Sequence, residues 1–335
     1  MKRLFAVFIL LAVLFCNFYP SDTLCYECSA TCDTEPNNSG IITYLVVGFD
    51  EGGENTDSIV LMNYNSFTNS FSLMQIPRDT YFAHGESGVK INRLFAYYLN
   101  KGYDRESALN ALCSDISDSL GISIRGYASF TLDAFQKLVD AIGGVKLTLS
   151  DDIAQKLVSL GIGLSLKEGV NHLSGKDALH FVRYREGYAL ADITRLDAQK
   201  IFLRAMISAV KSSMKPSVIF RVIRCAGDGF STNIKITEIL KIMVKNHSRI
   251  NDIKYSFFTV PGRSVMDSKG VWYYCINKNA MEKTLSSCGF NKRYEFDRGQ
   301  RFFNKQNPDF ASIYNSSEIN AKVFENEDLK NMNLY

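Results

Sequence analysis

An almost unbroken apolar run, followed at once by an acidic residue and glycines, constrains the fold of this chain most. Residues Ile41–Gly48 read Ile-Ile-Thr-Tyr-Leu-Val-Val-Gly, which is the pattern of a strand buried on both of its faces. Phe49 and Asp50 come next, and a glycine-containing loop, residues 51–55, follows them. The run therefore predicts a central strand of an α/β fold, with a carboxylate at its carboxyl end.

Two more strands are predicted directly after this loop. Residues 58–64 and 71–76 have the composition of strands, and Ser-Phe-Thr-Asn-Ser at residues 66–70 between them suits a hairpin turn. Pro77 ends the second of these strands, because proline cannot donate a hydrogen bond to a strand ladder. The segment as a whole predicts three strands that run alternately forward, back and forward.

Three charged residues are predicted to meet at one edge of the sheet. If the second strand runs back and the third forward, Asp50, Asp57 and Arg78 all emerge at the same edge. Ligands of open α/β sheets bind outside the carboxyl ends of the strands. Two carboxylates there suit a hard divalent cation such as Mg²⁺, which prefers one or two carboxylates together with phosphate oxygens.

The rest of the chain alternates between predicted helices and strands. Asp104, Thr131 and Ser174 each stand where a helix cap is expected. Val145–Leu149 and Ile253–Val260 have the composition of strands. This alternation predicts an α/β fold, an α–β–α sandwich around a mixed central sheet.

Arginine is concentrated in one stretch, where Arg183, Arg185 and Arg195 lie within thirteen residues. The spacing of Asp192, Arg195 and Gln199 puts them on one face of a helix. Arginines that converge beside a core edge suit an anion, and the bidentate guanidinium suits phosphate. On this stretch alone, a solvated helix face with ordinary ion pairs is an equal alternative. The charged residues at the predicted sheet edge favour the anion site.

In this combination the chain resembles the LytR–CpsA–Psr (LCP) family of cell-wall glycopolymer transferases. Six matching segments stand in the family's order over roughly residues 41–215, and we expect the likeness to extend to about residue 290. Each segment alone is a weak signal, whereas six in order, with the arginine spacing kept, are a strong one. The segments are Val47–Asp50, Thr56–Leu61, Gln75–Thr80, Lys90–Asn92, Leu138–Val145 and Leu173–Gln199.

The resemblance implies an enzyme that transfers a phosphoglycan from a polyprenyl pyrophosphate carrier to a hydroxyl of peptidoglycan. By their positions in the family's motifs, Asp50 and Asp57 would face Mg²⁺ or Mn²⁺. Gln199 would add a hydrogen bond to the substrate, and Lys90 would contact phosphate. Asp192 would orient arginines or help to take the acceptor proton. The residues that would clamp the pyrophosphate are Arg78, Arg183, Arg185 and Arg195.

The chain departs from the family's pattern at two places. Many members carry arginine before the second acidic motif, where this chain has Asn55 and Thr56. That change bears on metal or phosphate binding. The usual Asp-Phe-Gly-Arg is Asp-Ile-Thr-Arg at residues 192–195, so that Thr194 replaces a glycine.

Two other functions are compatible with the same residues. A hydrolase of polyprenyl pyrophosphate-linked glycans would use the same site with water as the acceptor, because the nucleophile is not part of the protein. A non-catalytic regulator or binder of cell-wall polymers would be favoured if Asp50, Asp57 or an arginine were missing, and all are present. Nucleic acid is not an expected partner, since the net charge is only +3.

A leucine-rich stretch around two glycines, residues 157–166, has two interpretations. A carrier lipid needs an apolar cavity beside the pyrophosphate site, and this stretch could line one. Ordinary packing in the core and in loops is the interpretation that we favour for any individual residue there.

The start of the chain indicates export. Lys2 and Arg3 precede an apolar run, Leu4–Phe15, which is typical of a secretory signal or a signal-anchor. The run is short for a spanning helix. The family resemblance nevertheless favours an uncleaved single-pass anchor in the cell membrane, with the N-terminus inside and the main domain outside. Cleavage and secretion are the alternative.

The sequence divides into four parts. Residues 1–20 are the membrane segment, 21–40 an extracytoplasmic linker, 41–290 the catalytic domain, and 291–335 a polar, loosely packed tail. For the cysteines of the linker, disulfides are favoured over a zinc half-site, because no second pair of ligands follows at the spacing that zinc needs. These cysteines are Cys25, Cys28 and Cys32.

From Lys2, Arg3 and the apolar run Leu4–Phe15, together with the family resemblance, we predict that the mature protein keeps its N-terminus and fractionates with membranes. N-terminal sequencing or mass spectrometry of the purified protein tests this. A soluble form that begins between Asn17 and Ala30 would show a cleaved signal instead.

Overall fold

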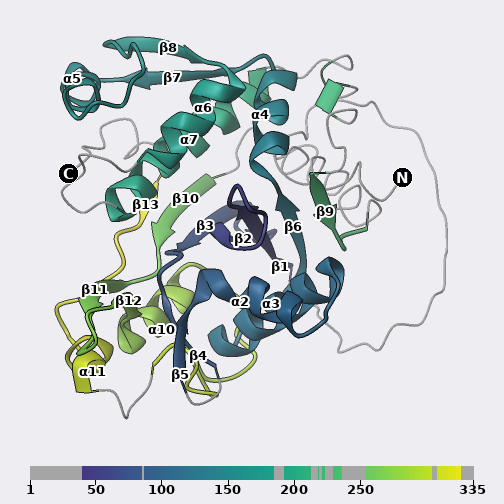
Figure 1. Ribbon diagram of the computed structural model, residues 1–335, viewed down its shortest axis with the longest axis vertical. Coiled ribbons are helices and arrows are strands. Elements are labelled where there is room, and N and C mark those ends of the chain that lie inside the picture. The colour runs from purple at the N-terminus through teal and green to yellow at the C-terminus, as the bar shows by residue number, and fades with distance from the viewer. Residues whose placement is uncertain are drawn as a thin grey trace.

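The fold is given by a computed structural model, in which Figure 1 shows a central sheet with helices on both sides. Its strands come from segments far apart in the sequence, so the sheet joins the first and last thirds of the chain. The residues that the structure describes are 40–84, 87–184, 192–212, 218, 221–222, 229–235, 254–303 and 308–325.

Seven strands of the described part form the central sheet. In their order across the sheet they are β13 (Phe324–Glu325), β10 (Lys254–Thr259), β3 (Ser70–Ile76), β2 (Thr56–Asn65), β1 (Ile41–Phe49), β6 (Ile124–Phe130) and β9 (Phe230–Thr232). The β1–β6 and β3–β10 pairs are parallel and the other neighbours are antiparallel. The mixed sheet predicted from the sequence is therefore confirmed.

The first three strands form as predicted, and their burial explains why. β1 lies between β2 and β6, and its successive side chains enter opposite cores: Tyr44 packs on one face and Leu45 on the other. The antiparallel register of β1–β2 and β2–β3 brings the end of β1, the start of β2 and the end of β3 together. We call this the charged edge of the sheet, because Asp50, Asp57 and Arg78 stand there.

Three helices cover one face of the sheet. They are α4 (Leu132–Ala141), α6 (Gly175–Arg183) and α7 (Asp192–Ser212). Side chains of β2 and β3, such as Met62 and Leu73, pack beneath them in one core.

Three other helices cover the opposite face. They are α2 (Leu94–Asn100), α3 (Arg105–Leu120) and α10 (Lys278–Ser287). Their core includes Leu61 and Met74, the sequence neighbours of the strand residues that face the first core. Because successive strand residues point to opposite faces, one sheet supports both cores, and the three-layer arrangement predicted from the sequence is present.

Caps start the helices where the sequence predicts them. The Asp104 carboxylate and the Thr131 hydroxyl each accept a hydrogen bond from the backbone N–H three residues later, at 2.7 and 3.3 Å. Ser174 and Asp177 form a full capping box at the start of α6. These bonds satisfy N–H groups that have no partner inside the helix.

Smaller elements surround this sandwich. They are β4 (Tyr81–His84), β5 (Ser87–Lys90), η2 (Ile91–Arg93), β7 (Val145–Leu149), α5 (Asp151–Ser159), β8 (Gly169–Leu173), β11 (Gly262–Met266), β12 (Trp272–Ile276) and α11 (Pro308–Tyr314). Three pairs of these strands, β4–β5, β7–β8 and β11–β12, form small antiparallel sheets. The predicted strand at residues 145–149 is thus present, but it pairs with β8 outside the central sheet.

Part of the predicted tail belongs to the folded core, which corrects the expectation of loose packing after residue 290. Phe296 and Phe302 stack on each other and lie in the core beneath α3. Phe310 and Tyr314 of α11 pack against β4 and β12. β13 adds a strand beside β10. Aromatic rings bury much apolar area per residue, so a few of them are enough to hold a polar stretch against the domain.

The membrane segment and the three linker cysteines fall outside the described residues. Within the ranges that the structure describes, no helix combines the length and the apolar character needed to cross a bilayer. Cys113, Cys275 and Cys288 are free thiols, and burial raises the pKa of Cys113 to about 12.

Asp297 organises the segment that follows α10. Its buried carboxylate accepts hydrogen bonds from the backbone N–H groups of Phe302 and Phe303, at 2.9 and 3.1 Å. Burial raises the pKa of this carboxyl to about 7, although these hydrogen bonds and Lys278 lower it. Since the pKa in the unfolded chain is about 3.9, the group takes up a proton on folding. Its contribution to stability is therefore complete below about pH 4 and is lost as the pH rises through about 7.

Asp297→Asn should accordingly destabilise the protein more at pH 4 than at pH 7.5, as measured by urea unfolding of both proteins. Glu295→Gln, an exposed neighbour in the same segment, is the matched control. A destabilisation that grows toward pH 7.5 would show instead that the native carboxyl is ionised and that its backbone hydrogen bonds dominate.

Candidate active site

An ion pair between Asp57 and Arg78 forms the centre of the charged edge. The pairing of Ile59 with Ile76 places residues 57 and 78 opposite each other, just beyond the β2–β3 ladder. Arg78 Nη1 lies 2.6 Å from Asp57 Oδ1, and the two side chains are only 20% and 14% exposed. Partial burial and a short charge-assisted hydrogen bond make this pair stronger than an ordinary surface pair. The predicted meeting of these two residues is confirmed.

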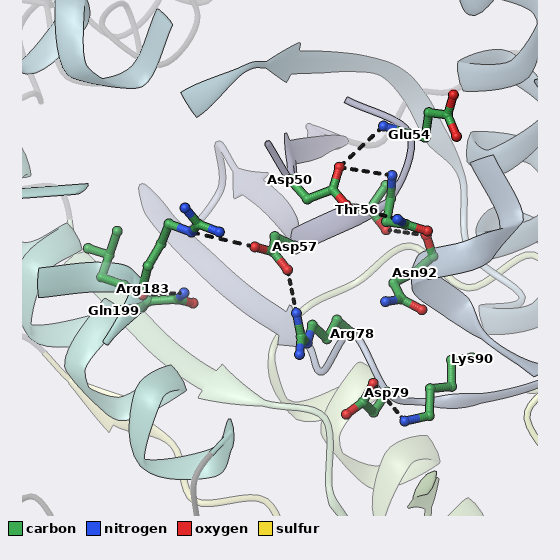
Figure 2. A network of polar contacts seen from close by, with 12 residues as sticks. Asp50, Glu54, Thr56, Asp57, Arg78, Asp79, Lys90, Asn92, Arg183 and Gln199 are labelled. Carbon is green, nitrogen blue, oxygen red and sulfur yellow. Dashed lines mark hydrogen bonds and ion pairs between the residues drawn. The ribbon is translucent and has the colours of Figure 1, made fainter. Parts of the chain in front are cut away.

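Arg183 approaches the same carboxylate from the helical layer. It is the last residue of α6, whose Phe181 is fully buried against the sheet. Its Nε lies 3.7 Å from Asp57 Oδ2, and Figure 2 shows Asp57 between Arg78 and Arg183. One carboxylate thus faces two guanidinium groups, which leaves an excess of positive charge suited to an anion.

Gln199 of α7 links helix α6 and strand β3 through its side-chain amide. Its Nε2 donates to the carbonyl oxygen of Val182 at 3.0 Å, and its Oε1 accepts from Gln75 Nε2 at 3.2 Å. Oε1 of Gln75 is buried and has no hydrogen-bond partner in the described part of the chain. The site therefore offers an unsatisfied acceptor next to its arginines.

Asp50 lies at the same edge but is held by its own loop (Figure 2). Its carboxylate accepts from the backbone N–H groups of Glu54 and Asn55, both at 3.2 Å, and from Asn55 Nδ2 at 2.8 Å. Burial raises the pKa of Asp50, but these hydrogen bonds, that of the Asn55 side chain first, outweigh it and keep the pKa below 3.8. Asn55 is one of the two residues that replace the arginine of many family members, and here it binds a carboxylate directly.

Lys90 reaches the charged edge but pairs with Asp79, with 3.2 Å between Nζ and Oδ1. Asn92, two residues further on, donates its backbone N–H to the carbonyl oxygen of Arg78 at 3.1 Å. The carbonyl oxygen of Asn92 accepts from the Thr56 hydroxyl at 3.5 Å. Oδ1 of Asn92 is buried without a hydrogen-bond partner among the described residues. This segment therefore ties the starts of β2 and η2 to the turn that carries Arg78.

An apolar cavity opens beside Asp57 and Arg183. It lies between the sheet and helices α4, α6 and α7, and its interior volume is about 140 Å³. Such a shape suits an amphipathic ligand, with the charged part at the arginines and the apolar part inside. Its apolar lining is Val46, Phe49, Val60, Met62, Leu73, Phe130, Leu132, Phe135, Leu138, Leu179, Val182, Phe202, Leu203 and Met206.

The leucine-rich stretch at residues 157–166 is not part of this lining. Leu157 and Ile162 are fully buried in the core, and Val158 is exposed. The interpretation of this stretch as ordinary packing is therefore confirmed. The cavity walls come instead from the apolar faces of α4 and α7, which periodicity predicts as helices but does not mark as binding surfaces.

Three predicted site residues cannot be placed by their side chains. Arg185 lies outside the described residues. The backbones of Asp192 and Arg195 lie in the first turns of α7, at the predicted spacing from Gln199, and their side chains are outside the description.

Two residues of the site were not predicted to be functional. Gln75 and Asn92 lie within the segments that resemble the family, Gln75–Thr80 and Lys90–Asn92. Both carry a buried oxygen atom without a partner among the described residues. Their positions at the ends of two family motifs could have marked both residues as candidates. Their buried oxygen atoms without partners result from tertiary packing and cannot be predicted from the sequence.

Comparison with known proteins agrees with this geometry. The chain matches the LytR_cpsA_psr family over residues 23–288. This protein belongs to the LytR_cpsA_psr family. The match includes all strands of the central sheet except β13, and it confirms the resemblance drawn from six short segments.

Named relatives of this LytR_cpsA_psr protein are cell-wall proteins. Cell wall biosynthesis protein LcpA of Corynebacterium glutamicum is 30% identical over 182 residues, which are 49% of this chain and 34% of LcpA. The polyisoprenyl-teichoic acid–peptidoglycan teichoic acid transferase TagU of Oceanobacillus iheyensis is 23% identical over 249 residues, 73% of this chain and 74% of TagU. TagU of Bacillus mycoides is 28% identical over 242 residues, 70% of this chain and 73% of that protein. The chain thus spans about a third of LcpA and about three quarters of these TagU proteins.

Solved structures share the fold. TagT bound to LI-WTA superposes with a TM-score of 0.60 at 21% identity, over 77% of this chain and 93% of TagT. The putative transcriptional regulator ywtF of Bacillus subtilis superposes with a TM-score of 0.58 at 22% identity, over 78% of this chain and 95% of that chain. At these identities the likeness establishes the mixed α/β architecture.

Proposed function

We propose that this protein transfers a phosphoglycan from a polyprenyl pyrophosphate carrier to a hydroxyl of peptidoglycan. The acceptor oxygen attacks the phosphorus that bears the glycan, and the bond from that phosphorus to the bridging oxygen breaks. Polyprenyl phosphate leaves, and the acceptor hydroxyl releases its proton. The product is a glycopolymer joined to peptidoglycan through a phosphodiester.

One observation carries this proposal: the apolar cavity opens directly beside the Asp57–Arg78–Arg183 cluster. A lipid pyrophosphate is an apolar chain with a compact, multiply charged head. Such a donor needs an apolar cavity and convergent guanidinium groups at the same place. The structure of the site therefore supports a lipid-linked phosphate as the donor.

The relatives support the class of reaction and of acceptor. TagU is named as a transferase from polyisoprenyl-teichoic acid to peptidoglycan, and LcpA as a cell wall biosynthesis protein. Family membership together with these names supports a transferase that works on the cell wall. At 23–30% identity, these names support the class of enzyme and not one particular glycopolymer.

In the free protein, Asp57 occupies the guanidinium groups of Arg78 and Arg183. A bound pyrophosphate would bring more negative charge than Asp57 and would accept hydrogen bonds from both arginines. Asp57 would then keep the guanidinium groups oriented. Phosphoryl transfer depends on this kind of charge neutralisation and in-line positioning more than on covalent help from the protein.

Other residues of the motifs would complete the clamp. Arg185 and Arg195 would add donors to the pyrophosphate, and Gln199, already held by Val182, would add a hydrogen bond. Asp192 would orient arginines or accept the proton of the acceptor hydroxyl. Lys90 would contact phosphate after leaving Asp79.

Asp50 and Asp57 are the candidate ligands of a hard divalent cation, which would share their oxygens with the loop N–H groups and the arginines that contact them now. Asp50 and Asp57 supply carboxylates, and the buried Oδ1 of Asn92 is a third oxygen at this edge without a partner among the described residues. Within the described ranges no cluster of three or more potential side-chain ligands of the His, Cys, Asp and Glu types occurs. Mg²⁺ or Mn²⁺ would thus be held by the two carboxylates, with phosphate oxygens and water completing its shell. Its chemistry is the neutralisation of phosphate charge.

The place of action follows from the substrates. Peptidoglycan lies outside the cell membrane and the carrier lipid lies in it. A single-pass anchor at residues 1–20 would hold the catalytic domain on the outer side, where both substrates meet. Secretion after signal cleavage is the alternative arrangement.

Arg183→Ala should lower transfer by roughly 10²–10³-fold, the scale of removing one preorganised donor. Arg183→Lys should restore only part of the activity, because lysine lacks the planar fork. The measurement is product analysis with a lipid-pyrophosphate donor, with and without a peptidoglycan acceptor. Arg293→Ala, which removes an exposed arginine from the C-terminal segment, is the matched control.

The same assay separates the competing functions. Release of free phosphoglycan at an equal rate with and without acceptor would indicate a hydrolase. Near-normal transfer by an Arg78→Ala, Arg183→Ala double variant would contradict the clamp.

A chelator should abolish transfer, and added Mg²⁺ or Mn²⁺ should restore it, because two carboxylates at this edge favour a cation. Asp57→Asn should lose metal-dependent turnover while its circular dichroism spectrum stays that of the parent, since the residue lies at the sheet edge and not in a core. Asp133→Asn, an exposed carboxylate on α4, is the control. Transfer at full rate in excess chelator would mean that arginines alone neutralise the phosphates.

A further inference from the structure

The β11–β12 hairpin begins at the charged edge. β10 runs parallel to β3, and Thr259 pairs with Gln75 near the ends of the two strands. The chain therefore leaves β10 at the same edge where Arg78 follows β3. β11 begins at Gly262, directly after this exit.

β12 is tied to the turn that carries Arg78. The backbone N–H of Tyr274 donates to the carbonyl oxygen of Asp79 at 2.9 Å, and Thr80 forms an isolated parallel bridge with Tyr274. The Tyr274 hydroxyl donates to the carbonyl oxygen of Val260 at 2.7 Å, and its ring is buried in the core. The hairpin is thus held against the site by both the backbone and the side chain of one residue.

Trp272 stands two residues before Tyr274 on the same strand. Side chains two residues apart share a face of a strand and are about 7 Å apart, so Trp272 extends the face of Tyr274 past the edge of the core. Met266 pairs directly with Trp272 across the hairpin. The two side chains are 56% and 51% exposed. Two large apolar groups therefore lie side by side, open to solvent, on the hairpin that Tyr274 ties to the Arg78 turn.

The turn beyond them is closed by hydrogen bonds, with Asp267, Ser268 and Lys269 at its tip and Val271 exposed beside Trp272. The Asp267 carboxylate accepts from the backbone N–H groups of Lys269 and Val271, at 2.9 and 2.8 Å. The backbone N–H of Asp267 donates to the carbonyl oxygen of Val271 at 2.9 Å. These bonds hold the apolar pair in place before any ligand arrives, which lowers the entropy cost of binding.

We propose that Trp272 and Met266 form a subsite for the acceptor glycan. The apolar C–H face of an N-acetylated sugar ring would lie on the indole, and the acetamido methyl group would contact Met266. The next sugar of the glycan chain would then present its hydroxyl to Asp57 and Arg78. This inference rests on the proposed function and adds the place where the acceptor binds.

A bilayer is the main competing partner for exposed apolar groups near a lipid site, and the geometry favours the glycan. Asp267, Ser268 and Lys269 form the tip of the hairpin, so polar groups would enter a membrane first. Trp272 lies back from this tip, on the face shared with Tyr274, whose backbone N–H donates to the carbonyl oxygen of Asp79 in the Arg78 turn. A ligand that rests on Trp272 is therefore directed along the charged edge.

The chain has one tryptophan, so its intrinsic fluorescence reports on Trp272 alone. Full-length protein in detergent micelles would be titrated with chitohexaose, a β-1,4-linked hexamer of N-acetylglucosamine. The expected result is a saturable fluorescence change with chitohexaose and none with maltohexaose, which has the same length but no acetamido groups. Absence of a response to chitohexaose would overturn the proposal. So would a blue shift seen only when the protein is placed in phosphatidylglycerol nanodiscs, which would identify a membrane contact.

Kinetics with variants test the role in transfer. Trp272→Ser should raise the KM for a soluble glycan acceptor by roughly 2- to 10-fold, the range of one aromatic contact. The kcat at saturating acceptor and the KM for the donor should stay unchanged, since uniform binding is lost and transition-state binding is not. Trp272→Phe should restore most of the affinity. Phe67→Ser is the matched control, because Phe67 is 66% exposed in the β2–β3 turn, at the opposite edge of the sheet.

The two proposals fail in different ways. If Trp272→Ser is active and has a normal KM for the acceptor, the subsite proposal is wrong and the proposed function stands. Saturable chitohexaose binding by a protein without transfer activity would remove the proposed function and leave the glycan subsite.

Discussion

The site depends on one carboxylate that two layers of the fold share. Asp57 comes from the sheet, Arg78 from the turn after the neighbouring strand, and Arg183 from the end of a helix above them. Without Asp57, the guanidinium groups of Arg78 and Arg183 would lose the carboxylate that lies between them and would repel each other at the mouth of the cavity. The ion cluster therefore holds the two arginines together at the mouth of the cavity while no phosphate is bound. The Asp57 carboxylate then faces the same guanidinium groups that a bound phosphate would face.

Local and strongly patterned features of this fold could be predicted from the sequence. β1 is a continuous apolar run, and Ser174 has the spacing of a capping box, so both were readable without tertiary information. The meeting of Asp57 with Arg78 followed from the alternating directions of three consecutive strands, a purely topological argument. The motif resemblance then supplied roles that spacing alone leaves open.

Other features depended on packing between distant segments. The cavity exists because α4, α6 and α7 leave space above the sheet, and no periodicity distinguishes a face that lines a cavity from one that fills a core. The environment of Asp50 depends on the path of a glycine-rich loop that returns Asn55 to its carboxylate. Phe296 and Phe302 are isolated aromatics in a polar stretch, a pattern that resembles a tail until the surface that receives them is known.

The short strand β13 has a consequence for how the molecule avoids self-association. It pairs with Ser256 and Phe257 of β10, which would otherwise be the outermost strand among the described strands of the sheet. Phe324 is buried there, and the ammonium groups of Lys200 and Lys322 lie 5.1 and 4.9 Å from the centre of its ring. A chain cut before this strand would present a template for pairing with another copy. The last described residues thus cover part of the outer strand, at the side of the sheet and away from the charged edge.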